Sequence, residues 1–172
     1  MRSKSGNFKQ INLPVFFGLS HLGQVFSLCW SKKIGNCYVF DRDDKTLDSF
    51  RKKKYTLEEP RLKKLKLNKI KFLDKFEEIK NFKYIFFTYD TPLNTKNGKP
   101  KLNYISQNLK RILSLKFQNK TYLILSSQIN PELVKDINKQ LSKNKNIKIF
   151  YLVDTLKMGE ALEKFLNPNQ II

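Results

Sequence analysis

Two patterns of apolar residues alternate along the chain. Short continuous apolar runs, such as Val15-Phe16-Phe17 and residues 84–87, are typical of strands buried on both faces of a parallel sheet. Between such runs, apolar residues recur at helical spacing, as at Leu22, Val25 and Phe26. Strands are expected at 11–17, 37–40, 70–73, 84–88, 121–125 and 147–152. Helices are expected at 21–33, 45–54, 59–65, 74–80, 102–115, 131–141 and 154–165.

This alternation predicts an α/β fold, a doubly wound, mostly parallel six-stranded Rossmann-like sheet with helices on both faces. The 172 residues, 40% of them hydrophobic, suffice for one domain with a core. We expect a flexible N-terminus at 1–10 and a single domain at 11–172. The longest apolar runs are too short for a membrane span, and the polar start lacks the apolar segment of a secretory signal. A cytoplasmic protein is expected.

The charge of the chain raises a nucleic-acid hypothesis. A formal net charge of +19 would attract a phosphate backbone. Nearly all of this charge is lysine, however, whereas arginine is the side chain that reads phosphate and guanine in bidentate fashion. Specific nucleic-acid binding is therefore the less favoured hypothesis. Cys29 and Cys37 lack metal-type spacing, so we expect reduced packing residues and no metal site.

A glycine pattern follows the first predicted strand. Gly18 ends the apolar run, Gly23 stands five positions later, and Asp41 ends the next strand. Together they outline a dinucleotide-binding βαβ unit, in which Gly18 makes the tight turn and Gly23 lets the helix approach the sheet. Asp41 would accept the ribose hydroxyls and repel a 2′-phosphate, which favours NAD over NADP. A βαβ turn that binds no ligand remains the alternative.

Two residues inside the pattern leave their roles open. Ser20 stands where the middle glycine normally lets the pyrophosphate approach the backbone. Its hydroxyl would either donate to a phosphate oxygen or exclude the dinucleotide. His21, the one histidine, would lie near the phosphates or face solvent in the first helical turn. The residues after the fourth and fifth strands, 89–99 and Ser126-Ser127, lie at the carboxyl edge, where open α/β sheets bind ligands.

These motifs, taken in order, resemble those of one protein family over residues 11–172. The matching pieces are Gly18-Leu19-Ser20-His21-Leu22-Gly23 for the glycine fingerprint, Phe40-Asp41-Arg42-Asp43 for the strand-end acid, Glu59-Pro60 with Leu62 for a Glu-Pro-Gly-Leu piece, Asp90-Thr91-Pro92 for a Thr-Pro loop, Ser126-Ser127 for a Ser-Thr pair, and residues 156–161 with 165–168 for Phe-Leu-x-Glu-Gly and Asn-Pro segments. The chain resembles the N-terminal NAD-binding domain of the UDP-glucose/GDP-mannose dehydrogenases.

The resemblance implies an NAD-dependent oxidation of a nucleotide sugar and a set of site residues. The cofactor-binding positions it implies are Gly18, Ser20, His21, Leu22, Gly23, Asp41, Thr91 and Ser127, with Asp154 and Ser127 as catalytic candidates. Departures from the family pattern are Ser20 and Arg61 for glycines, Ser127 for threonine, Asp154 for glutamate and Met158 for an acid.

The family's nucleophilic cysteine, with its assisting lysine and asparagine, belongs to central and C-terminal regions beyond this chain. We therefore expect this chain alone not to complete the reaction, and an exposed apolar patch near Phe165 and Ile171-Ile172 where another domain would pack. The alternative functions are a stand-alone degenerate Rossmann module that binds or regulates without catalysis and, less favoured, a basic nucleic-acid-associated domain.

Overall fold

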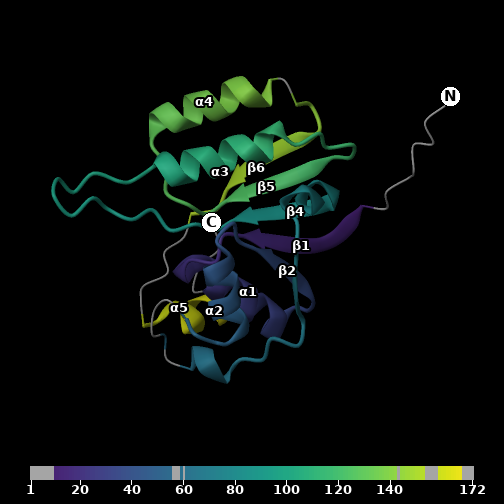
Figure 1. The fold of residues 1–172 in the computed structure, drawn as a ribbon. Helices are drawn as coiled ribbons and strands as arrows, with labels where there is room; N and C mark the ends of the chain where they lie inside the picture. Colours follow the sequence, from purple (N-terminus) through teal and green to yellow (C-terminus); the bar gives the residue numbers. More distant parts are fainter. Residues whose placement is uncertain (1–9, 56–58, 60, 143, 154–158, 168–172) are drawn as a thin grey trace.

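A computed structural model of the chain describes residues 10–55, 59, 61–142, 144–153 and 159–167 (Figure 1). Its strands are β1 (Ile11–Phe17), β2 (Cys37–Phe40), β3 (Ile70–Phe72), β4 (Phe82–Phe87), β5 (Thr121–Leu125) and β6 (Ile147–Tyr151). They form one sheet in the order β3-β2-β1-β4-β5-β6, and every pair of neighbours is parallel. The expected six-stranded Rossmann-like sheet is confirmed.

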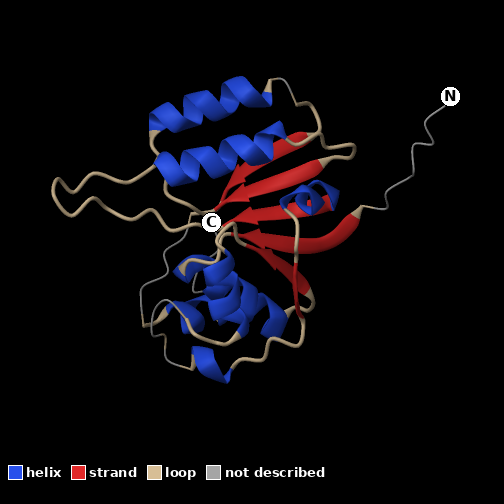
Figure 2. Ribbon diagram, in the orientation of Figure 1, coloured by secondary structure: helices blue, strands red, loops and turns tan. Residues whose placement is uncertain are grey.

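Helices cover both faces of this sheet (Figure 2). The α-helices are α1 (His21–Lys33), α2 (Asp44–Arg51), α3 (Asn103–Ser114), α4 (Pro131–Leu141) and α5 (Ala161–Leu166). Successive side chains of a strand point to opposite faces, so Val15 and Phe17 join the core under α3 and α4, whereas Phe16 joins the core under α1, α2 and α5. The continuous apolar runs are thus explained by burial on both sides.

The order of the strands places a crevice at the carboxyl ends of β1 and β4. The chain leaves β1 through α1 toward β2 and β3, and later crosses back to β4 on the other side of β1. Phe16 of β1 pairs with Val39 of β2 and with Phe86 of β4. Ligands of open α/β sheets bind outside the strand ends at such a switch point.

The short elements between residues 59 and 81 differ from the expected α-helices. They are the 3₁₀ helices η1 (Leu62–Lys64) and η2 (Phe76–Asn81). Segments this short gain too few i→i−4 bonds to offset the cost of nucleating an α-helix. Helix α2 also differs from its expected bounds, because it ends at Arg51 rather than at residue 54. Lys53 has a positive φ of 55°, which is outside the helical region.

The helix expected at 154–165 begins only at Ala161, and residues 154–158 lie outside the described part. This helix, α5, packs on α1, with the rings of Phe165 and Phe26 4.7 Å apart. The exposed patch expected near Phe165 is therefore wrong at that residue, while Ile171 and Ile172 are not described. Among the described residues, no helix has the length and apolarity that crossing a membrane requires.

Candidate functional site

The turn between β1 and α1 depends on its two glycines. Gly18 has a φ of +106°, and a Cβ atom there would lie 2.7 Å from the ring of Tyr89. A Cβ atom on Gly23 would lie 1.7 Å from the Gly18 carbonyl oxygen. Both distances are far below van der Waals contact, so larger residues at either position would displace the turn. The packing roles expected for Gly18 and Gly23 are confirmed.

Asp41, at the end of β2, stabilises this turn through hydrogen bonds of its side chain. Its Oδ2 accepts a hydrogen bond from the Leu19 amide at 2.7 Å, and its Oδ1 accepts one from the Asp43 amide at 3.0 Å. Only 3% of the residue is exposed, and burial raises the pKa of Asp41. Each carboxylate oxygen still has a second lone pair, so the group can accept further hydrogen bonds from a ribose.

Ser20 connects the start of α1 to the segment after β4. Its Oγ donates to the Thr88 carbonyl oxygen at 3.0 Å and accepts from the Asp90 amide at 2.7 Å. The hydroxyl proton is therefore used within the protein. Donation from Ser20 to a phosphate would require this bond to Thr88 to break, and that role of Ser20 stays a prediction.

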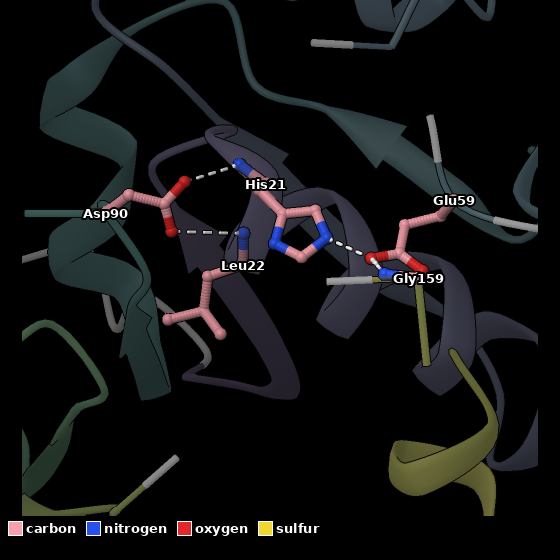
Figure 3. Close-up of polar contacts among 5 residues, drawn as sticks. All are labelled: His21, Leu22, Glu59, Asp90 and Gly159. Carbon is pink, nitrogen blue, oxygen red and sulfur yellow. Dashed lines mark hydrogen bonds and ion pairs between the residues drawn. The ribbon is translucent and has the colours of Figure 1, made fainter. Parts of the chain in front are cut away.

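Asp90 occupies the N-terminus of α1 (Figure 3). One carboxylate oxygen accepts from the His21 amide at 2.9 Å and the other from the Leu22 amide at 3.3 Å. These amides lie at the positive end of the helix dipole, where the pyrophosphate of a dinucleotide binds in folds of this type. The sequence contained no signal for this contact beyond the position of Asp90 after a central strand.

The ring of His21 points away from Asp90, toward Glu59 (Figure 3). Its Nε2 lies 2.6 Å from Glu59 Oε1, which also accepts from the Gly159 amide at 2.9 Å. The alternative of a solvent-facing His21 is wrong, because the side chain is 10% exposed and that of Glu59 only 1%. In the sequence Glu59 stands out only as part of a family motif, because residues 38 positions apart give no local pattern.

A cavity of about 780 Å³ opens at the carboxyl edge of the sheet. Residues from three segments line it: Leu19 and Ser20 after β1, Asp41, Asp43 and Thr46 after β2, and Tyr89, Asp90, Pro92, Asn94 and 99–105 after β4. A cavity of this size is typical of small-molecule sites. Its place beside Asp41 fits the nucleoside part of a dinucleotide, whereas Asp90 holds the amides on which the pyrophosphate would bind.

The other candidate residues lie beside this cavity or outside the described part. Thr91 Oγ1 donates to the Gln128 carbonyl oxygen at 2.8 Å. Ser127 is 1% exposed and donates to the Tyr89 carbonyl oxygen at 2.5 Å. Both hydroxyls thus tie the segment after β4 to the segment after β5, and neither residue lines the cavity. Asp154 lies outside the described residues.

The cysteines and acids of the described residues form neither a metal site nor a reactive thiol. The described residues contain no group of three or more His, Cys, Asp or Glu that could hold a metal ion. Cys29 and Cys37 are free and buried, and burial raises the pKa of each thiol to about 12. Both are therefore protonated at neutral pH, as expected of packing residues.

Several solved structures of nucleotide-sugar dehydrogenases have the same fold as this chain. The GDP-mannose dehydrogenase of Pseudomonas aeruginosa has a TM-score of 0.76 at 19% identity and covers 90% of this chain and 39% of its own. The UDP-glucose dehydrogenase of Pyrobaculum islandicum gives 0.75 at 16%, with 99% and 41% covered. The UDP-N-acetyl-mannosamine dehydrogenase Cap5O of Staphylococcus aureus gives 0.73 at 20%, with 92% and 40% covered.

The chain thus spans about two fifths of the length of these enzymes. A comparison with curated proteins finds no match. The sequence profile of one family matches residues 13–172, the span over which the glycine turn, Asp41 and the cavity have been described. The chain belongs to the UDP-glucose/GDP-mannose dehydrogenase family, as its NAD binding domain.

Proposed function

We propose that this chain supplies the NAD-binding part of an enzyme that oxidises a CH–OH group of a nucleotide sugar. The observation that carries the proposal is the cavity at the switch point, with Asp41 in its lining, in a chain of the NAD-binding family. Bound NAD⁺ would supply the hydride acceptor. The substrate class follows from the structural neighbours, which are dehydrogenases of GDP-mannose, UDP-glucose and UDP-N-acetyl-mannosamine.

In this proposal the residues of the turn shape and orient the cofactor site. Asp41 accepts hydrogen bonds from the adenosine ribose, Gly18 and Gly23 keep the turn compact, and Thr91 and Ser127 position the segments nearest the nicotinamide. Asp154 retains the catalytic role that the family resemblance implies.

The chemistry of the sugar is assigned to a further part of the enzyme. Nucleophilic catalysis through a thiol requires an accessible thiolate, and Cys29 and Cys37 are buried, protonated thiols. We therefore propose that the chain alone binds cofactor without completing the oxidation. Free thiols are also compatible with the cytoplasm, where we place the protein.

Calorimetric titration with NADH, beside NADPH, tests the cofactor assignment. The titrations are made at about 0.15 M salt, where the Debye length is about 8 Å and general attraction of phosphates to the basic surface is screened. Saturable NADH binding is expected, with NADPH weaker because Asp41 repels a 2′-phosphate. Replacement of Asp41 by Asn should weaken NADH binding by about tenfold, in line with the loss of charge-assisted hydrogen bonds.

Asp48→Asn, a change of an exposed acid on α2, is the matched control and should bind NADH like the wild type. Circular dichroism of Asp41→Asn checks that the buried site still folds. Equal, salt-sensitive binding of NADH and NADPH, unaffected by Asp41→Asn, would contradict the proposal and favour a Rossmann module without a cofactor. Release of NADH from NAD⁺ and UDP-glucose or GDP-mannose by this chain alone would contradict the assignment of the chemistry to another part.

A further inference from the structure

We propose that Asp90 is an internal competitor for the dinucleotide pyrophosphate, held on α1 by Ser20, so that NAD(H) binds only when Asp90 leaves the helix. The inference rests on the proposed function, and it adds a residue that sets the affinity of the site for phosphate-bearing ligands. Three observations carry it: the contacts of Asp90, the bonds of Ser20 and the composition of the cavity lining.

The first observation is that Asp90 bonds to α1 as an anion would. Both of its carboxylate oxygens are engaged, one by the His21 amide and the other by the Leu22 amide. No residue of the first turn of α1 is acidic, and Ser20 makes no capping bond with its side chain. The negative charge that complements this end of the helix dipole therefore comes from a residue 69 positions away from His21. A pyrophosphate would need the same two amides.

The second observation is that Ser20 sets the position of Asp90. Its hydroxyl accepts from the Asp90 amide and donates to the Thr88 carbonyl, so it holds the backbone of 88–90 against the start of α1. A glycine at position 20 has no atom to make these bonds. Ser20 and Asp90 therefore act together. The serine replaces the glycine that would admit a phosphate, and it positions Asp90, whose carboxylate occupies the place of that phosphate.

The third observation is that the nucleoside part of the cavity stays open. Asp41, Thr46 and Tyr104 line the same cavity as Asp90 but are separate from the amides that Asp90 occupies. The side chains of Lys99 and Lys101 also belong to the lining and would attract phosphates. Asp90 is exposed, so its carboxylate can turn into water without the cost of burying a charge. Competition by Asp90 should therefore weaken the binding of phosphates and leave the binding of the nucleoside unchanged.

Titrations with adenosine, ADP and NADH separate these contributions. Adenosine has no phosphate and reports on the cavity alone, whereas ADP and NADH also need the helix amides. The wild type is compared with Asp90→Ala, which frees the amides, and with Ser20→Gly, which removes the bonds to residues 88–90. Asp136→Asn, on the exposed face of α4, controls for the loss of one negative charge far from the site.

The expected result is specific to phosphate. Asp90→Ala should bind ADP and NADH about five- to thirtyfold more tightly than the wild type, the upper range for a charge at a helix terminus. Adenosine affinity should change by less than about twofold, because adenosine never competes with the carboxylate. Ser20→Gly should shift the ADP and NADH affinities in the same direction, and Asp136→Asn should leave all three unchanged.

Each other outcome has a definite meaning. If NADH binds the wild type and Asp90→Ala equally, or adenosine tightens as much as NADH, the inference is overturned while the NAD-binding proposal stands. If only Asp90→Ala binds NADH, the inference is supported and the wild-type chain fails as an NAD-binding domain. If neither binds NADH at millimolar concentration although circular dichroism shows both folded, both proposals are overturned.

Discussion

At the scale of single residues, Arg61 carries a backbone conformation that favours another amino acid. Its φ is +69° and its ψ −3°, in the left-handed region. The family pattern has glycine at this position, and glycine reaches that region without the steric cost of a Cβ atom. The arginine is also exposed, so it contributes little packing in return. The backbone at this position therefore favours glycine although the residue is arginine.

Replacement of Arg61 by glycine should therefore stabilise the fold. We expect the free energy of unfolding to rise by about 1 kcal/mol, since relief of left-handed strain outweighs the greater freedom of glycine in the unfolded chain. A shift of the urea midpoint at constant slope measures the change. Lys64→Gly, on an exposed neighbour whose φ is not positive, is the control and should destabilise. A loss of stability in Arg61→Gly would show that the arginine makes a compensating contact.

At the scale of secondary-structure elements, the start of α1 is held by two acids from distant segments. Asp90 binds its backbone amides, and Glu59 binds the His21 ring while also accepting from the Gly159 amide. Glu59 thus joins α1 to Gly159, two residues before α5, and α5 itself packs on α1. The turn between β1 and α1 is therefore supported by Gly159 and α5 near the end of the chain as well as by the sheet.

A double-mutant cycle should show that His21 and Glu59 are energetically coupled. His21→Ala and Glu59→Ala should each destabilise the fold by about 1–3 kcal/mol, because each leaves a buried polar group without its partner. The double variant should lose less than the sum of the two, with a coupling free energy of about 1–2 kcal/mol. Urea unfolding of the four proteins measures it. Strict additivity would mean that the 2.6 Å contact contributes nothing of its own.

At the scale of the whole molecule, the net charge of +19 works against the compact state. Lysines are close neighbours along the sequence at several surface positions, among them the exposed Lys63 and Lys64 in η1 and Lys66 just after it. Like charges on a folded surface repel, and salt screens this repulsion once the Debye length falls below their spacing. The stability of the domain should therefore depend on ionic strength even without a ligand.

The melting temperature should rise by several degrees between about 0.02 and 0.3 M NaCl. Most of that rise should come below about 0.1 M, where screening changes fastest. A variant with Lys63, Lys64 and Lys66 replaced by glutamine should melt higher at low salt and respond less to NaCl. Calorimetric scans of both proteins make the comparison. A melting temperature that falls with NaCl would show that attractive ion pairs outweigh the repulsion between lysines.

Much of this molecule was predictable because its signals are local. Continuous apolar runs and helical spacing predicted every strand and the helices α1 to α4 to within a few residues, and the glycines at 18 and 23 predicted the turn between β1 and α1. The short segments around η1 and η2 were predicted less well, because a few residues at helical spacing cannot distinguish an α-helix from a 3₁₀ turn.

By itself, the sequence determined the fold and the family pattern, since periodicity and the glycine turn act between near neighbours along the chain. Only the tertiary structure decided which side chains meet at the start of α1. Asp90 and Glu59 bond to the start of α1 from 69 and 38 positions away, and Gly159 bonds to Glu59 from 100 positions away. Such long-range bonds leave no periodic trace in the sequence. The sequence showed Ser20 as a departure from a glycine, and the folded chain places its hydroxyl on the backbone amide of Asp90.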